Sequence, residues 1–193
     1  MHVTFHHQIT DPAMRERLWN LYERGFRDVA DRAVYRLMLY RSEFDEEMRS
    51  STTRKWVVWD DTTPVGLGAI ATDLASGNFW VNPRYLARRY PEHFAAGRVH
   101  YNLFVVVAPE YRSGRAASIL MRKGLAMEAR EDVVLIFDVG DANQSDDFGG
   151  LAAFGARAAG GAELLEIIET QRYYGLHLGR PRADAAPELT RAR

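Results

Sequence analysis

The sequence contains no cysteine, which excludes disulfide bonds, thiolate metal ligands and a cysteine nucleophile. Lysine is almost absent as well, because Lys55 and Lys123 are the only lysines among the 25 basic residues. The formal net charge is −1, so we expect neither nucleic acid nor a membrane surface as a partner. Together with the many alanines, the preference for arginine indicates a GC-rich genome, and we expect a bacterial source.

Long apolar runs are also missing. No stretch approaches the roughly 20 residues of a membrane span. Residues 1–10 lack the basic segment and the apolar segment of a signal peptide, so we expect a cytoplasmic protein. The length of 193 residues suits one well-packed domain. We expect that domain over residues 1–178 and a disordered tail over residues 179–193, where prolines and scattered charges occur.

Several catalytic and metal-binding motifs are absent. The sequence has no Gly-x-Ser-x-Gly, no phosphate loop of the Gly-Lys-Ser type and no internal repeat. Histidines occur near the N-terminus, but terminal histidines are more often solvated than metal-bound. The aspartates of residues 141–147 lack the spacing of a calcium loop. We therefore expect no metal.

The most informative stretch is residues 101–121, which read YNLFVVVAPEYRSGRAASILM. Its β-branched run predicts a strand, the small residues after Arg112 predict a loop, and the apolar spacing that follows predicts an amphipathic helix. In a strand-loop-helix unit, backbone N–H groups and the helix dipole can bind a pyrophosphate. Arg112 and Arg115 can add full positive charge to the same anion.

The element order predicts one α/β domain with a mixed central sheet flanked by helices. Apolar periodicity, caps and turns indicate the order β-α-α-β-β-insert-β-α-β-α-β. The expected strands span residues 2–7, 55–60, 65–74, 98–108, 133–139 and 162–170. The expected helices begin at Asp11-Pro12 and at Ser42, and the later ones span residues 84–90, 113–130 and 148–159.

This order and the motif together resemble the GNAT acetyltransferase superfamily, and the chain would be a divergent member. Val107, Pro109 and Arg112 match its Val-x-Pro-x-x-Arg signature in type and spacing. The glycine-rich turn of the family is altered here to Ser113–Ala117. Arg115 is the main departure, because its side chain could crowd the phosphates or bind them. The alternative is an ordinary strand-to-helix turn with solvated arginines.

The resemblance implies transfer of an acyl group from a CoA thioester directly to an amine. In such enzymes the pantetheine pairs with the exposed edge of the cofactor strand, and backbone N–H groups polarise the thioester carbonyl. The expected donor is acetyl-CoA or another acyl-CoA, and the expected acceptor is a small-molecule amine. The residues expected to contact CoA are Val105, Val106, Val107, Arg112, Ser113, Gly114, Arg115, Ala116, Ala117 and Asn143. For Asn143, simple turn chemistry is the alternative.

The catalytic groups are harder to assign because the chain departs from the family pattern. The helix expected over residues 148–159 has no tyrosine to protonate the leaving thiolate, and the cofactor strand has no acidic residue. The remaining candidates are His100, Asp138 and Tyr173, the last as a thiolate acid. Asp138 lies in an apolar run, where burial would raise its pKa toward that of a general base. Purely structural roles are the alternative for His100 and Asp138.

An aromatic insert precedes the cofactor strand at residues 75–97. It contains five aromatic residues, of which Trp80 and Tyr85 are the candidate walls of an acceptor pocket. Its arginines indicate an acceptor or donor that carries an anionic group. The alternative is a small satellite core beneath a loop.

Three functions are consistent with these features. The first is an acyl-CoA-dependent N-acyltransferase, and the second is a GNAT-fold module that binds CoA or another ligand without turnover. The third is an acyltransferase that takes its acyl group from a carrier protein, which would need less of the pyrophosphate loop. A homodimer is compatible with the sequence, which does not decide it.

Overall fold

The computed structural model describes residues 1–31, 33–36, 38–75, 81–112, 115–140 and 166–174. Several predictions therefore fall outside the described residues. They are the CoA contacts of Ser113, Gly114 and Asn143, the pocket wall Trp80, the helix over residues 148–159 and the tail over residues 179–193.

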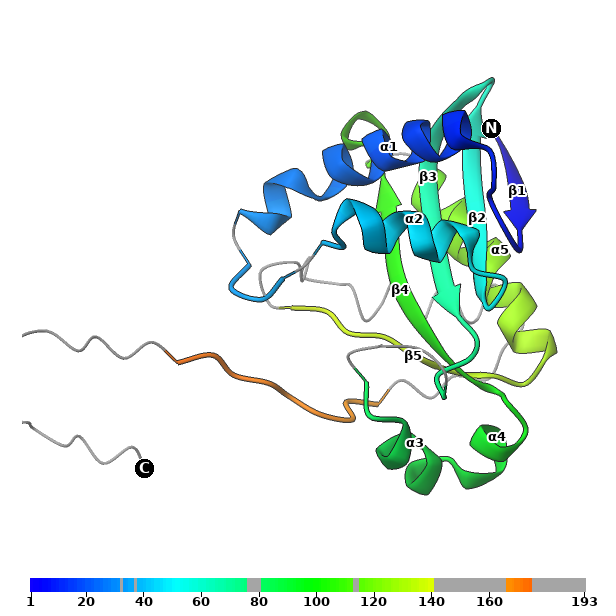
Figure 1. The fold of residues 1–193 in the computed structure, drawn as a ribbon, viewed down its shortest axis with the longest axis vertical. Coiled ribbons are helices and arrows are strands. Elements are labelled where there is room, and N and C mark those ends of the chain that lie inside the picture. The colour runs from blue at the N-terminus through cyan, green and yellow to red at the C-terminus, as the bar shows by residue number, and fades with distance from the viewer. Residues whose placement is uncertain (32, 37, 76–80, 113–114, 141–165, 175–193) are drawn as a thin grey trace, which may run out of the picture.

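The described strands form one mixed sheet in the order β1-β2-β3-β4-β5 (Figure 1). The first four pair antiparallel, and β5 pairs parallel to β4. The bounds of the strands are β1 His2–His6, β2 Thr53–Asp60, β3 Thr63–Ala71, β4 Val99–Val107 and β5 Val134–Ile136. With helices on both faces, this confirms the predicted α/β class with a mixed central sheet.

Two helices, α1 (Pro12–Ala30) and α2 (Arg41–Arg49), cover one face of the sheet, and α5 (Ala116–Arg130) covers the other (Figure 1). The predicted start of α1 is confirmed, because the Asp11 side chain accepts hydrogen bonds from the first-turn amides and Pro12 follows it. The short helices α3 (Pro83–Arg89) and α4 (Pro91–Ala95) lie at the end of the sheet where β4 begins.

Helix α1 approaches β4 so closely that only glycine fits at the contact. A β-carbon at Gly25 would lie 2.1 Å from Cγ2 of Val106. Beside this contact, aromatic rings of α1, α2 and β4 form the core, with Tyr22 and Phe44 fully buried against Phe104. The Tyr22 hydroxyl accepts a hydrogen bond of 2.8 Å from the backbone N–H of Leu39, so this buried phenol is satisfied.

Strands β4 and β5 diverge soon after they begin to pair. Their pairing runs only from Val99 opposite Val134 to Tyr101 opposite Ile136, although β4 continues to Val107. A bulge on the other side of β4 leaves Leu103 without a partner residue in β3 and bends the strand at the same level. The second half of β4 therefore has no described strand on its β5 side.

Two strand predictions are wrong in extent. The apolar run at residues 133–139 forms only the three-residue β5, because its neighbour turns away after Tyr101. The last expected strand, residues 162–170, is not formed in its described part, since residues 166–174 contain neither helix nor strand.

Candidate active site

The loop after β4 is held against α1 by side chains. Glu110 accepts hydrogen bonds of 2.7 and 2.9 Å from Arg24, and the Tyr111 hydroxyl donates a bond of 2.7 Å to Asp60. Arg112 donates a hydrogen bond of 2.7 Å to the carbonyl oxygen of Gly25 and lies 3.5 Å from the Asp28 carboxylate. These contacts fix the position of the loop before α5 begins.

The two arginines of the predicted pyrophosphate loop therefore differ. The Arg112 side chain is turned toward α1, whereas Arg115 is exposed just before the first turn of α5. No described side chain caps that first turn, although Asp11 caps α1 and Asn82 caps α3. Among the described side chains, none therefore competes with an anion for the orphan N–H groups at the start of α5, and Arg115 lies beside them.

A second group of residues meets where β4 and β5 separate. The hydroxyl of Tyr101, on β4, donates a hydrogen bond to the carboxylate of Asp138, two residues beyond β5. Burial raises the pKa of Tyr101, so the phenol stays protonated and acts as a donor. Asp138 itself is exposed. The prediction that this carboxylate is buried is therefore wrong, because the apolar strand ends before it.

A further tyrosine, Tyr35, lies near Asp138, and Tyr173 packs against Tyr35. The Tyr35 hydroxyl accepts a hydrogen bond of 3.2 Å from the N–H of Gly140, and its ring stacks on that of Tyr173 with 6.4 Å between centroids. Partial burial, with a smaller contribution from the charge of Asp138, raises the pKa of Tyr35. The structure thus connects two predicted residues, Asp138 and Tyr173, through Tyr35, which the sequence did not indicate, and adds the hydroxyl of Tyr101 as a hydrogen-bond donor to Asp138.

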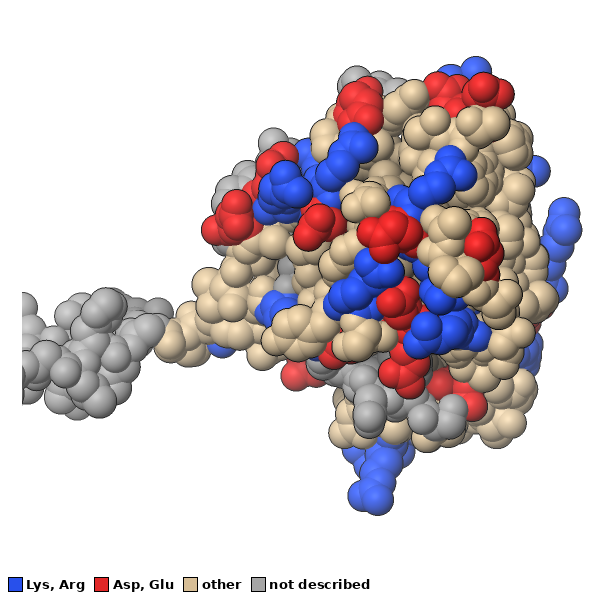
Figure 2. Space-filling view, turned by 45° about the horizontal axis from the view of Figure 1, so that its top comes forward, with Lys and Arg blue, Asp and Glu red and all other residues tan. Residues whose placement is uncertain are grey.

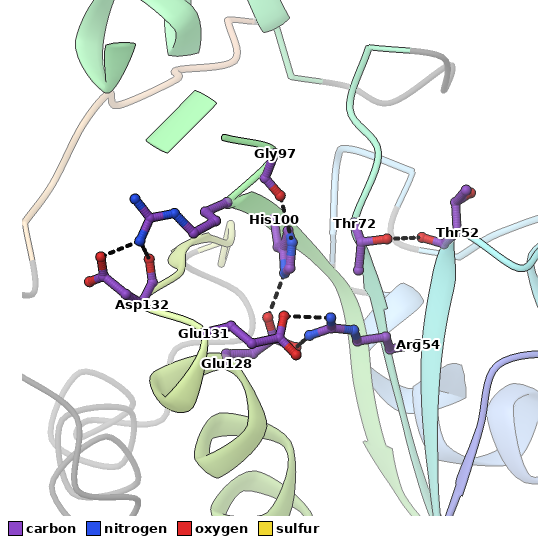
Figure 3. A network of polar contacts seen from close by, with 9 residues as sticks. Thr52, Arg54, Thr72, Gly97, His100, Glu128, Glu131 and Asp132 are labelled. Atoms are coloured by element: carbon purple, nitrogen blue, oxygen red, sulfur yellow. Dashed lines mark hydrogen bonds and ion pairs between the residues drawn. The ribbon is translucent and has the colours of Figure 1, made fainter. Parts of the chain in front are cut away.

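His100 lies on the other face of β4, inside a closed polar network (Figure 3). Its Nδ1 lies 2.5 Å from Glu128 and its Nε2 lies 3.2 Å from the carbonyl oxygen of Gly97. Arg54 donates to Glu128 at 2.9 Å and to Glu131 at 2.6 Å. His100 is only 3% exposed and both ring nitrogens face acceptors. The structure therefore does not support His100 as a base that reaches a substrate.

The described part of the aromatic insert forms a satellite core at the end of the sheet. Leu86 is buried against Val99 and Tyr101. The Tyr90 hydroxyl and Arg89 both donate to Glu166, so one of the insert's arginines is already neutralised. Tyr85 is 36% exposed on α3, and its role as a pocket wall stays a prediction.

Neither a membrane-spanning helix nor a cluster of metal-binding side chains occurs in the described part of the chain. None of its helices is long and apolar enough to cross a membrane. It also contains no group of three or more histidine, aspartate or glutamate side chains placed to hold a metal ion.

The strand-loop-helix unit and the diverging strands can be compared with known proteins. The model of the acetyltransferase (GNAT) family matches residues 15–146. The chain belongs to the acetyltransferase (GNAT) family. This confirms the family predicted from the sequence. No curated protein matches the chain.

Solved GNAT structures share the fold at low sequence identity. The ribosomal-protein-S18-alanine N-acetyltransferase of Escherichia coli has a TM-score of 0.51 at 9% identity, covering 78% of this chain and 74% of its own. An aminoglycoside acetyltransferase from an uncultured soil metagenomic sample, solved with sisomicin, has a TM-score of 0.52 at 11% identity and covers 91% and 96%. The BH1408 protein of Bacillus halodurans has a TM-score of 0.54 at 13% identity and covers 91% and 99%.

Proposed function

We propose that this GNAT protein transfers an acyl group from acetyl-CoA, or another acyl-CoA, to the amine of a small molecule. The separation of β4 from β5 beside the uncapped start of α5 carries the proposal. In the family, pantetheine pairs with the free edge of the cofactor strand, which here is Val105–Val107. Val105 is 38% exposed, as a strand edge open to a ligand requires. The pyrophosphate would lie on the first amides of α5, including those of Ala116 and Ala117, next to Arg115.

The acceptor amine would bind at Asp138, on the side of β4 opposite His100. An exposed carboxylate attracts an ammonium ion, and the ring faces of Tyr35 and Tyr173 add a cation–π contribution. The hydroxyl of Tyr101 fixes the orientation of the carboxylate by donating to it. This charge pattern favours a cationic acceptor over the anionic one that the insert's arginines indicated.

The chemical step needs a proton acceptor and a proton donor. Asp138, directly or through water, would take a proton from the ammonium, and the neutral nitrogen would then attack the thioester carbonyl. A C–N bond forms and the C–S bond breaks, the CoA thiolate takes a proton from Tyr173 or from water, and the second proton of the nitrogen passes to the phenolate or hydroxide left behind. Because an exposed carboxylate is a weak base, we expect turnover to rise with pH as more of the amine is already neutral.

The second candidate is a binding module that holds CoA without turnover. One observation favours it: His100 is buried beside Glu128, so its ring is not placed to act on a substrate. Among the described residues, that leaves the exposed carboxylate of Asp138 as the candidate base near the diverging strands.

Thiol release from acetyl-CoA in the presence of an amine panel separates the two functions. The panel should contain monoamines, diamines, amino acids and an aminoglycoside. For the amine that is acetylated, Asp138→Asn should lower kcat about 100-fold at neutral pH, the lower end for acid–base catalysis, and less at high pH. Glu169→Gln, an exposed carboxylate near Tyr173, is the matched control and should retain activity. Binding of acetyl-CoA without thiol release for any amine would favour the binding module.

A further inference from the structure

The exposed side of α5 carries only positive charge. Arg115, Arg122, Lys123 and Arg130 are all exposed, and at 3.6 residues per turn they fall within an arc of about 100°. The acidic residue of the helix, Glu128, points to the opposite side and is buried. None of the four cations makes an ion pair or a side-chain hydrogen bond within the part of the chain that the structure describes. We call these four residues the α5 cationic face.

Another part of the molecular surface is mixed in charge. The view in Figure 2 shows positive and negative side chains next to one another. Ion pairs account for this mixture, as between Arg24 and Glu110 and between Arg36 and Glu43. The whole chain has a net charge of −1, so positive and negative residues are almost equal in number. Four unpaired cations on one helix face are therefore a local excess of positive charge.

An apolar groove adjoins the far end of the α5 cationic face. It lies between α5 and the edge of the sheet formed by β1 and β2, and has a volume of about 260 Å³. Its lining residues are Val3, Phe5, Trp56, Lys123, Ala126, Met127 and Arg130. A ligand that fits this surface therefore combines several negative charges with an apolar side chain at one end.

The length of the face distinguishes a small donor from a large one. From Arg115 to Arg130 the helix rises about 22 Å, or four turns. If the phosphate of a donor such as CoA lies at the start of α5, its single nucleotide extends along the first two turns of the helix, about 11 Å. Lys123, Arg130 and the groove lie beyond that nucleotide, and the whole face, about 22 Å long, matches the length of a protein helix of four turns.

We propose that the α5 cationic face and the adjoining groove dock an acidic carrier protein that delivers the acyl group on a phosphopantetheine arm. This rests on the proposed function, because the arm would use the same gap between β4 and β5 as acyl-CoA. An acidic helix of the carrier lies along α5, and one of its apolar side chains fills the groove beside Met127. The acyl C–S bond to the carrier's arm breaks, the C–N bond to the acceptor forms, and the free thiol leaves on the carrier.

The test measures binding and transfer with a charge-reversed variant. The probe is an acidic acyl carrier protein with an acetylated phosphopantetheine arm, compared with acetyl-CoA at low salt. Lys123→Glu combined with Arg130→Glu should weaken carrier binding and lower kcat/KM for the carrier about 10- to 100-fold, while kcat/KM for acetyl-CoA changes less than about threefold. Arg49→Glu, which changes an exposed arginine at the end of α2, is the matched control and should change neither value more than about twofold. If the double variant fails to fold, Lys123→Gln with Arg130→Gln should show the same selectivity to a smaller extent.

The outcomes separate this proposal from the proposed function. Turnover of acetyl-CoA with no binding of the carrier overturns the docking proposal and leaves the acyltransferase intact. Carrier binding that the double variant abolishes, without turnover of either donor, supports docking and contradicts the acyltransferase. Equal losses for both donors, or binding to phosphatidylglycerol vesicles or tRNA that matches binding to the carrier, overturn the docking proposal.

Discussion

The guanidinium of Arg112 donates a hydrogen bond of 2.7 Å to the carbonyl oxygen of Gly25, which joins the loop after β4 to the middle of α1. Gly25 is also the point where α1 meets β4, since a β-carbon there would lie 2.1 Å from Val106. Arg112, the arginine of the family signature, therefore has a structural role in this protein. It holds the loop against α1, while Arg115 remains the exposed cation at the start of α5.

Arg112→Gln should lower the free energy of unfolding by about 1 kcal/mol, because a hydrogen bond from a charged group is lost at a half-exposed site. Urea unfolding measures this loss. Arg115→Gly should leave stability nearly unchanged and weaken acetyl-CoA binding by about 1.5–3 kcal/mol, measured by calorimetric titration. The reverse pattern, with Arg112→Gln reducing affinity but not stability, would show that Arg112 binds the phosphates.

Glu128→Gln should lower the free energy of unfolding by about 1.5–3 kcal/mol, because it removes the buried carboxylate that faces Nδ1 of His100 and one of the two carboxylates that accept hydrogen bonds from Arg54. Glu131→Gln is the control, since its carboxylate pairs with the same arginine but is 45% exposed, and it should cost less than about 1 kcal/mol. Thermal and urea unfolding of both variants provide the comparison. Equal and small losses would mean that the network does not stabilise the junction of β4 with α5.

The buried lysine Lys55 should make stability rise with pH. Its Nζ donates to the backbone carbonyl oxygens of His7 and Ser50, and burial lowers its pKa to about 8, from an ordinary value of 10.5. Between these two pH values the unfolded chain binds more protons than the folded chain. The free energy of unfolding should therefore rise by up to about 3 kcal/mol across that window and stay at its lower level below pH 8.

The only other lysine is the natural control for this effect. Lys55→Met should remove most of the rise between pH 8 and 10, whereas Lys123→Met, which changes an exposed side chain, should keep it. The measurement stops at pH 10, the ordinary pKa of tyrosine. Burial raises the pKa of Tyr22 to about 12, so above pH 10 the folded chain binds more protons at Tyr22 than the unfolded chain does, and the free energy of unfolding falls as pH rises. An unchanged slope in Lys55→Met would assign the pH dependence to other groups.

The sequence predicted the elements whose signals are local. The Asp11-Pro12 cap, the antiparallel strands β2 and β3 and the strand-loop-helix unit after Val105 all depend on residues close in the chain. The extent of β5 was not predictable in this way. Its apolar run is seven residues long, but pairing depends on where β4 turns away, and that is a long-range property of the sheet.

The candidate site shows the same division. His100 was a candidate catalytic residue and Asp138 was expected to be buried, yet in the structure His100 is buried and Asp138 is exposed. The burial of His100 could have been predicted from the sequence of α5. Glu128 follows Leu120 and Gly124 at intervals of four, so its carboxylate lies on the buried face of the helix and needs a hydrogen-bond donor there. No comparable pattern marks Tyr35, because it reaches Tyr173 and Gly140 through contacts between distant segments.

The central claim is that acetyl-CoA binds between β4 and β5 with its pyrophosphate at the start of α5. Amide hydrogen exchange with and without saturating acetyl-CoA tests this claim most directly, because it reads individual segments and needs no acceptor. We expect slower exchange in the second half of β4, residues 102–107, and in the first turn of α5, with little change in β1 and α2. Unchanged exchange in both segments, or protection confined to other parts of the chain, would contradict it.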